Sequence, residues 1–286
     1  MAATRSPALR AQWLGGMLRD LRESNRLPLR ETARFLERSA STVSRFESGA
    51  LPIAPADVAA LLDFYHVEGA LQRSALLRLA EDPAAAGWWE RYRADISPAT
   101  GDRIWLEDRA ERIRVFSPLA VTALLQTEAY ARAVIAAGAP GAPDRQVERW
   151  VEVRMKRQAV LEGDSPARLD VLLDEAALRR PAGGPAAMRD QLAHLRASGE
   201  RDNIRIRVLP FDAGAYADPV TDGGFSLIAL DGPLPEVAHA DGATGRVLLA
   251  HDDVTRLGAL YDRLEAGCLA EAESADFLAA VESAAG

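Results

Sequence analysis

The sequence is poor in cysteine, with Cys268 as the single thiol among 286 residues. One cysteine excludes an internal disulfide bond and any zinc site built from several thiolates. The segment around Cys268 is rich in alanine and leucine and has a helical pattern, so we expect a small, buried, apolar side chain there. A redox-sensing thiol is the alternative interpretation.

Long apolar runs and metal-binding motifs are also missing. No run of 18 or more apolar residues and no signal-peptide pattern occurs, so we expect a soluble, cytoplasmic protein with no membrane partner. The four histidines lack ligand spacing, and the H-E-x-x-H motif, which places two histidines and a glutamate around zinc, is absent. The glycine pairs at 183–184 and 223–224 are isolated turn residues. We therefore expect neither a metal nor a cofactor.

Charge is unevenly distributed along the chain. Residues 1–80 contain 11 arginines and 8 acidic residues, a net charge of +3, whereas residues 81–286 contain 23 basic and 34 acidic residues, a net charge of −11. Together these make the overall −8. A nucleic acid is attracted to the basic part, so we expect a nucleic-acid surface in the N-terminal region. Lys156 is the only lysine beside 33 arginines, a skew typical of a GC-rich bacterial genome.

Residues 29–49, LRETARFLERSASTVSRFESG, have the spacing of a helix-turn-helix DNA-binding motif. The first helix carries Leu29, Ala33 and Leu36 at i, i+4 and i+7, which makes an apolar stripe. Ser39 is suited to cap the second helix, because its hydroxyl can accept a hydrogen bond from a free N–H of the first turn. The motif therefore predicts two short helices packed across each other.

The second helix of this motif has a polar outer face. At about 100° per residue, Val43 and Phe46 lie on or beside the buried side. The outward residues are small and hydroxyl-bearing or cationic: Ser41, Arg45 and Ser48, flanked by Thr42 and Ser44. Arginine can bind O6 and N7 of guanine, and serine or threonine can donate or accept, so this face suits a major groove. A merely solvated helix face is the alternative.

Residues 9–80 resemble the phage-repressor-like (XRE) DNA-binding domain, a bundle of five helices. The resemblance is carried by Leu18, Leu21, Arg22, Ala33, Leu36, the run Ser41-Thr42-Val43-Ser44-Arg45, and Glu47 followed by Gly49. It implies base-facing positions at Ala40, Ser41 and Arg45. It also implies a salt bridge between Arg22 and Glu47 that ties the first helix to the recognition helix. Ala40, where glutamine is common, offers only apolar contact to a thymine methyl.

The sequence departs from this family pattern at three positions. Glu37 stands where the turn usually has glycine, Arg38 where an aliphatic residue is usual, and Thr32 where leucine is usual. A non-glycine residue forced to positive φ costs about 1–2 kcal/mol, so we expect a strained turn or a less stable domain. Arginines around the motif are expected to contact phosphates, which positions a protein on DNA without specifying sequence. They are Arg26, Arg30, Arg34 and Arg38.

The pattern changes after residue 82, and we place a domain boundary there, with a DNA-binding domain over residues 1–82 and a second domain over 83–286. The second domain is predicted to be α+β, with a mainly antiparallel sheet of about four or five strands. The predicted strands are Leu169–Leu173, Ile204–Val208, Phe225–Leu230, Glu236–Ala240 and Arg246–Ala250. The predicted helices are Trp105–Val115, Leu119–Ala137, Asp144–Leu161, Ala186–Ser198, Asp252–Ala266 and Glu271–Ala284.

Residues 88–280 resemble the C-terminal domain of unassigned function found on XRE-type regulators of actinobacteria, including WhiJ-type developmental regulators. The matching segments are Leu124-Leu125-Gln126-Thr127 with Tyr130, Asp174-Glu175-Ala176-Ala177-Leu178, Gln191-Leu192 with Leu195, and Val208-Leu209-Pro210-Phe211 with Gly214. Where a Pro-Gly pair is usual before the first segment, this chain has Val121-Thr122-Ala123. The resemblance implies a small companion protein, because such regulators are commonly encoded beside one.

Polar and aromatic residues of the second domain are candidates for an effector site. Those with a candidate role in ligand binding are Trp105, Gln126, Tyr130, Glu175 and Phe211. Aromatic residues at such spacing are more often part of a core. Adjacent acids at positions 174–175 resemble a paired-carboxylate site for acid–base catalysis, but acids at a strand-to-helix junction more often cap the helix that follows.

These observations together predict a sequence-specific transcription regulator that binds double-stranded DNA as a homodimer, with phosphate contacts from Arg30 and Arg38. Its second domain is expected to sense a small molecule or a small protein partner. The alternative is a hydrolase or transferase activity in the second domain, which no nucleophile–base pair or metal set in the sequence supports, so we expect no enzyme. An interaction scaffold with a vestigial DNA-binding part is a further alternative, which the retained Arg45 disfavours.

Overall fold

The computed structural model describes residues 9–81, 87–214, 223–230, 232–240, 246–248 and 251–284. The chain divides into two compact units, the first built chiefly from the residues before Trp88 and the second from Trp89 onward. The boundary expected at residues 82–83 lies outside the described residues. In the described part, no helix is both long enough and apolar enough to cross a lipid bilayer.

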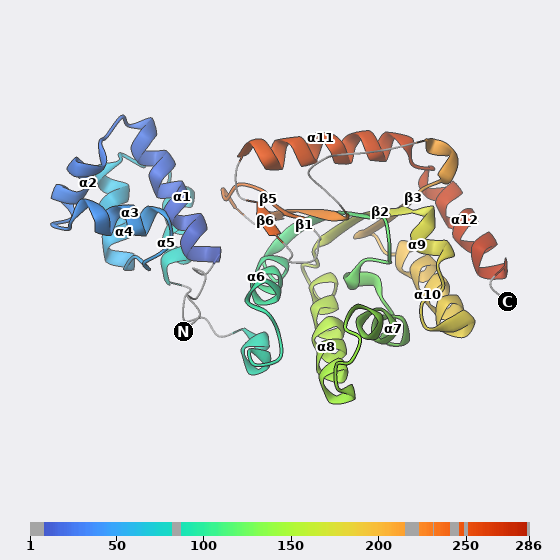
Figure 1. The fold of residues 1–286 in the computed structure, drawn as a ribbon. Coiled ribbons are helices and arrows are strands. Elements are labelled where there is room, and N and C mark those ends of the chain that lie inside the picture. The colour runs from blue at the N-terminus through green and yellow to red at the C-terminus, as the bar shows by residue number, and fades with distance from the viewer. Residues whose placement is uncertain are drawn as a thin grey trace. The chain divides into compact units, whose positions relative to one another are not determined.

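The first unit is a bundle of helices, two of which lie in the segment 29–49 that was predicted as a helix-turn-helix motif. In chain order they are α1 (Leu9–Ser24), α2 (Leu29–Phe35), α3 (Ala40–Glu47), α4 (Pro55–Phe64) and α5 (Ala70–Glu81) (Figure 1). Its core is made of buried apolar side chains that include Trp13, Leu18, Val43, Leu62 and Leu76. Because these residues recur at helical spacing, each short helix buries one side and exposes the other.

The second unit contains a mixed sheet of six strands in the order β3-β2-β1-β4-β5-β6. The strands are β1 (Ala110–Ser117), β2 (Arg168–Asp174), β3 (Ile204–Leu209), β4 (Phe225–Leu230), β5 (Val237–Ala240) and β6 (Arg246–Leu248). Residues 249–250 of the last predicted strand lie outside the described residues. Strands β1, β2 and β3 pair in parallel, and β4, β5 and β6 are added antiparallel.

The prediction of a mainly antiparallel sheet was therefore wrong. Parallel neighbours need a long crossover between consecutive strands. The segments between β1 and β2, and between β2 and β3, contain helices that supply such crossovers. The hairpin-like spacing of the last three strands, in contrast, allows antiparallel pairing.

The central strand β1 occupies part of a segment predicted as a helix from Trp105 to Val115. Helix α6 (Pro98–Glu107) ends before this strand begins, so Trp105 belongs to the last turn of α6. In β1 the buried residues Ile113 and Val115 alternate with Arg112 and Arg114, the period of two of a strand. The apolar residues at the end of the helix and those of the strand have a combined spacing that resembles one helical stripe, which is why a single helix was predicted.

The other predicted helices are present with shifted ends. The segment predicted as one helix over 119–137 is divided into η3 (Ala123–Leu125) and α7 (Glu128–Gly138), because the Thr127 hydroxyl accepts from the Tyr130 N–H and caps a new helix. The remaining elements are η2 (Trp88–Tyr92), α8 (Asp144–Arg157), η4 (Gln158–Leu161), α9 (Glu175–Arg179), α10 (Gly184–Gly199), η5 (Phe211–Ala213), α11 (His251–Gly267) and α12 (Glu271–Ala284).

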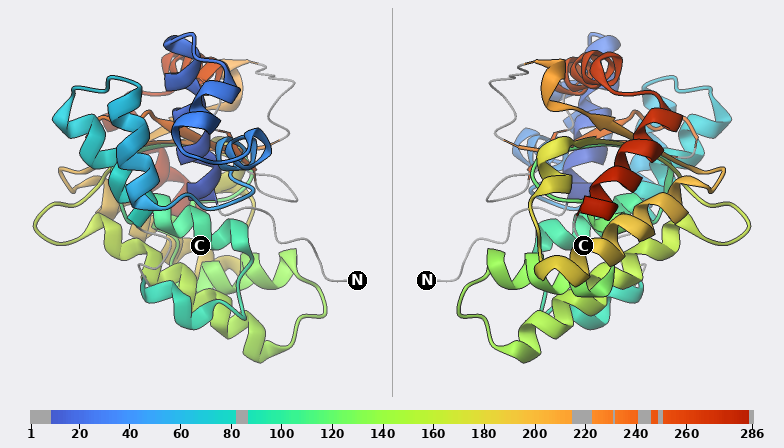
Figure 2. Two further views of the ribbon diagram at one scale, coloured as in Figure 1. Left: turned by 90° about the vertical axis from the view of Figure 1, so that its left-hand side faces the viewer. Right: turned by 90° about the vertical axis from the view of Figure 1, so that its right-hand side faces the viewer.

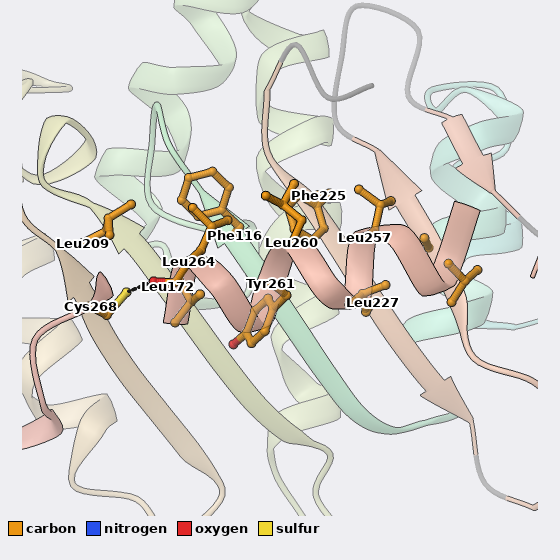
Figure 3. Close-up of a cluster of buried hydrophobic side chains, with 12 residues drawn as sticks. Phe116, Leu172, Leu209, Phe225, Leu227, Leu257, Leu260, Tyr261, Leu264 and Cys268 are labelled. Atoms are coloured by element: carbon orange, nitrogen blue, oxygen red, sulfur yellow. Dashed lines mark hydrogen bonds between the residues drawn. The ribbon is translucent and has the colours of Figure 1, made fainter. Parts of the chain in front are cut away.

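Helices cover both faces of the sheet. Figures 1 and 2 show α11 on one face and α6, α7, α8 and α10 on the opposite face. Under α11, Phe116, Phe225 and Leu227 of the sheet form a buried cluster with Leu257 and Tyr261 of the helix (Figure 3). Alternate residues of β4 therefore point away from α11, toward the α6 and α8 side.

Cys268 lies at the edge of this apolar cluster, as Figure 3 shows. Its thiol donates to the backbone carbonyl of Leu264 at 3.3 Å, and burial raises its pKa to about 11. Since the thiolate is the reactive form of cysteine, a thiol with this pKa is inert at neutral pH. The geometry favours the buried, apolar interpretation over a redox sensor.

Candidate nucleic-acid interface

Helix α3 begins with a side-chain cap. The Ser39 hydroxyl accepts a hydrogen bond from the Thr42 backbone N–H at 3.1 Å, and its oxygen lies 2.8 Å from Ser41 Oγ. Val43 and Phe46 are buried on the inner side of the helix. The helix is thus held by its cap and by one apolar side, which leaves the other side open to solvent.

The open side of α3 carries the residues predicted to contact bases. Ser41, Ser44 and Arg45 are exposed, and Ala40 and Thr42 are partly exposed. No side chain in the described ranges forms an ion pair with the Arg45 guanidinium. A cation and several hydroxyls therefore share one exposed strip, which is the chemistry that contacts to base edges in the major groove require.

Exposed arginines lie on and beside the neighbouring helix α2. Arg26, Arg30 and Arg34 are exposed, and Arg38 is half-exposed, with its guanidinium 3.8 Å from the Asp57 carboxylate. An exposed pair at this separation contributes little to stability, so Arg38 can exchange Asp57 for a phosphate at small cost. The helix-turn-helix segment thus exposes several cationic side chains besides Arg45.

An ion pair joins the first helix to α3. Arg22 Nε donates to Glu47 Oε1 at 2.7 Å, and Arg22 Nη2 donates to Glu47 Oε2 at 3.0 Å. The Arg22 side chain is 11% exposed and that of Glu47 is 9% exposed. The hydrogen bonds to Glu47 raise the pKa of Arg22. Because this pair is bidentate and shielded from water, it fixes the orientation of α3 on α1.

The three departures from the family pattern each have a local structural account. Glu37 adopts φ of 54°, the left-handed conformation in which a side chain is strained. Thr32 is buried, and its hydroxyl accepts from the Tyr65 hydroxyl at 3.3 Å, so its polar atom is paired. Arg38 is exposed next to Asp57. None of these residues lies on the open side of α3.

Two glycines let α1 approach the end of α3: Gly49, which belongs to the family pattern, and Gly15, which was not predicted to have a role. A Cβ atom on Gly15 would lie 2.3 Å from the carbonyl oxygen of Phe46, which is closer than any real contact. Gly49 has φ of +68°, and its Cβ would lie 2.4 Å from the backbone nitrogen of Gln12. The pair Gly15-Gly16 inside a helical pattern was the available signal, since glycine in a helix interior costs stability unless packing requires it.

Two candidate ligand residues of the second unit serve the local fold. The Tyr130 hydroxyl accepts from the Val121 N–H at 3.2 Å, and Gln126 Nε2 donates to the Val121 carbonyl at 2.6 Å. Both side chains are buried. They hold the chain that enters η3, while Gln126 Oε1 also accepts from Arg154 Nη1 at 2.9 Å.

The other three candidate ligand residues, Glu175, Phe211 and Trp105, have different contacts from Gln126 and Tyr130. Glu175 accepts from the Phe211 N–H at 2.9 Å and from Arg179 Nε at 2.6 Å, and it is buried. The Phe211 ring is exposed, whereas Trp105 is buried with the Arg109 guanidinium 4.7 Å above its ring. Hydrogen bonds thus join Glu175 to Phe211, and they join Gln126 to Tyr130 through Val121. In the part of the chain that the structure describes, no hydrogen bond joins one pair to the other.

The acids at positions 174–175 have separate structural roles. The Asp174 carboxylate accepts from the Ala176 N–H at 2.7 Å and is the N-cap of α9. Glu175 is engaged by Arg179 and by the backbone of Phe211, as described above. Within the described ranges, no three of the side chains that bind metals gather into a possible metal site.

Comparison with protein families gives two matches. Residues 13–75 match the model of a helix-turn-helix domain, and residues 100–280, more than half of the chain, match the model of a domain of unknown function, DUF5753. The first match covers α3 and the ion pair between Arg22 and Glu47. No curated protein and no solved structure matches the chain.

Proposed function

The chain belongs to the DUF5753 family, and we propose that it is a transcription regulator of the phage-repressor-like (XRE) type that binds a specific duplex sequence. The observation that carries this proposal is the open strip on α3, where exposed Ser41, Ser44 and Arg45 lie opposite the buried Val43 and Phe46. The helix-turn-helix match over residues 13–75 supports DNA binding independently of that geometry.

In the proposed mechanism, α3 enters the major groove. The Arg45 guanidinium binds guanine O6 and N7, and the hydroxyls of Ser41, Thr42 and Ser44 form supporting hydrogen bonds. Ala40 contacts a thymine methyl. The arginines on and beside α2, Arg30 and Arg38 among them, bind phosphates and set the register of the helix.

Replacing Arg45 by alanine tests the proposal. We expect Arg45→Ala to weaken specific binding by about 1–3 kcal/mol and to relax the preference at one base pair. Affinity is measured by gel shift on a selected operator and on scrambled duplexes at fixed salt. Arg78→Ala, an exposed arginine on α5, is the control and should bind as the parent does. Equal affinity of Arg45→Ala and its parent for the operator would reject the proposed role.

For the second unit we propose a sensory role without catalysis. Gln126, Tyr130 and Glu175 hold backbone turns, so we assign none of them a catalytic role. The signal is a small molecule or a small companion protein, as in the actinobacterial regulators that the sequence resembles, and the protein acts in the cytoplasm, where the DNA is. Co-expression with the product of the adjacent gene, followed by size-exclusion chromatography, tests the companion. Separate elution of the two proteins would leave the small molecule as the signal.

A further inference from the structure

A polar cluster lies on the side of the sheet that α6 and α8 cover. Arg157 donates twice to Glu107, at 2.7 and 2.8 Å, and Arg103 Nε donates to Glu107 Oε1 at 2.9 Å. Arg103 Nη1 is also 3.3 Å from His239 Nδ1 of β5. The cluster therefore connects α6, α8 and the antiparallel part of the sheet through a buried carboxylate.

Arg154 is the member of this cluster whose charge is not matched. It lies one turn before Arg157 on the same side of α8, and its side chain donates to the neutral amide oxygen of Gln126. Among the described residues no carboxylate pairs with Arg154. Burial and the charges of Arg157 and Arg103 lower its pKa to about 10. Arg154 is partly buried, and a cation partly withdrawn from water is less stable unless an anion accompanies it.

A second unsatisfied group faces the same cluster. The Ser226 hydroxyl is fully buried and has no hydrogen-bond partner. Phe225 and Leu227 point toward α11, so Ser226, between them, points toward α6 and α8. It is directly opposite His239 in the register of β4 and β5, which brings the two side chains within about 5 Å. A buried hydroxyl without a partner is an unfavourable arrangement unless something else binds it.

We propose that this cluster binds the oxyanion group, carboxylate or phosphate, of a small molecule, with Arg154 as its main charged contact and Ser226 as a buried hydroxyl at the inner end. Guanidinium groups bind carboxylate and phosphate oxygens bidentately, so an oxyanion matches Arg154 better than a halide or a neutral group does. The full burial of Ser226 favours a small molecule over a protein. The regulatory use of this site rests on the proposed function, but the binding itself does not.

Thermal unfolding of the full-length protein tests the site, with inorganic phosphate and citrate as the probes and sodium chloride used to match ionic strength. We expect the Tm of the parent to rise with either probe, because a ligand that binds the folded state stabilises it. Arg154→Met should weaken the apparent affinity about 10- to 100-fold, the effect of losing charge-assisted hydrogen bonds. In chloride alone Arg154→Met should unfold at the parent's Tm or above, because it removes a partly buried charge that no carboxylate matches.

Two further variants make the test specific. Arg145→Met removes an exposed arginine from the same helix, and it should keep the full response to the probes. Ser226→Ala should unfold in chloride at the parent's Tm or above, because it removes a buried hydroxyl without a partner, and it should lose part of the response. Equal responses of Arg154→Met and Arg145→Met would overturn the proposal, as would an unchanged Tm of the parent with both probes. If Arg154→Met has a lower Tm than the parent in chloride but its Tm still rises fully with the probes, Arg154 only stabilises the local fold, and the proposal is overturned.

The same variants separate this inference from the proposed function. Thermal unfolding is measured without DNA, and gel shifts are measured without phosphate or citrate. If the protein responds to the probes but does not discriminate operator DNA, the oxyanion site is supported and the regulator proposal is rejected. If the protein binds its operator through Arg45 and its Tm does not change with either probe, the regulator proposal is supported and the oxyanion site is rejected.

Discussion

Glu37 shows how one residue stores strain beside the proposed interface. Its φ of 54° is the conformation that glycine adopts freely, and the turn between α2 and α3 requires it. The rest of the turn is well bonded, since the Arg38 N–H donates to the Ala33 carbonyl at 2.9 Å. The strain is therefore confined to one position that carries an exposed side chain.

Replacing Glu37 by glycine should stabilise the first unit. Relief of about 1–2 kcal/mol of strain, less the 0.4–1 kcal/mol that glycine's freedom in the unfolded chain costs, leaves a gain of about 0–1.6 kcal/mol. Chemical denaturation followed by circular dichroism measures the change. Glu37→Ala keeps the Cβ atom and should show no such gain. A loss of stability in Glu37→Gly would show that the Glu37 side chain stabilises the turn by contacts of its own.

At the scale of elements, the crossing of α1 and α3 depends on Gly15. Its missing side chain lets the α1 backbone reach the carbonyl oxygens of Phe46 and Glu47. The bidentate pair between Arg22 and Glu47 then holds the same two helices in register. The orientation of α3 is thus set by one close backbone contact and one buried ion pair.

Gly15→Ala and Gly16→Ala form a matched pair that tests this crossing. The Cβ of Gly15→Ala meets backbone atoms, so we expect a loss of about 1–3 kcal/mol of stability and weaker DNA binding. A Cβ on Gly16 meets no atom within 4 Å, so Gly16→Ala should gain about 0.5–1 kcal/mol from helix propensity. Denaturation curves and gel shifts of both variants give the comparison. Similar behaviour of the two would contradict the close-contact account.

Another pair of elements, α6 and α8, is joined by the buried carboxylate of Glu107. Burial by itself raises the pKa of this group, but the charges of Arg157 and then Arg103 outweigh burial and lower the pKa to about 2. A depressed folded-state pKa stabilises the fold at pH values above the ordinary pKa of 4.5. That stability is lost as the pH falls from there toward 2.

Glu107→Gln should accordingly destabilise the second unit at neutral pH by about 3–5 kcal/mol, because it leaves buried arginines without their counter-charge. The difference from the parent should shrink as the pH falls below about 4.5. Urea denaturation between pH 3 and pH 8, in about one-unit steps, follows both effects. Glu282→Gln, which removes an exposed pair with Arg196, should cost at most about 1 kcal/mol. A pH-independent difference for Glu107→Gln would argue against the depressed pKa.

At the scale of the whole molecule, a single α3 offers few base contacts. Helix-turn-helix proteins bind as dimers to half-sites about one helical turn apart. We therefore expect a homodimer in solution, with twice the monomer mass of 30.8 kDa, and a footprint of two half-sites about 10 base pairs apart. Light scattering after size-exclusion chromatography and hydroxyl-radical footprinting measure these. A monomer that protects one half-site would refute the dimer.

The distribution of charge along the chain supports different roles for the two units, with DNA binding in the first unit only. The basic residues 1–80 attract DNA, and the acidic remainder, at −11, is repelled by it. Within this acidic unit, an anion is attracted only where arginines outnumber carboxylates locally. The cluster of Arg154, Arg157 and Glu107 is such a place within an acidic unit.

The sequence by itself determined the local features: the two helices of the segment 29–49, the Ser39 cap, and the outward side of α3. Each follows from spacing within about one turn, which the side chains of a short segment settle among themselves. Only the tertiary structure decided the parallel order of β1, β2 and β3, the identity of β1 as the central strand, and the meeting of Gly15 with Phe46. The same holds for Arg154 and Ser226, which lie 72 positions apart in the sequence. Strand order and buried charge depend on which distant segments pack together, and periodicity within a segment does not encode that.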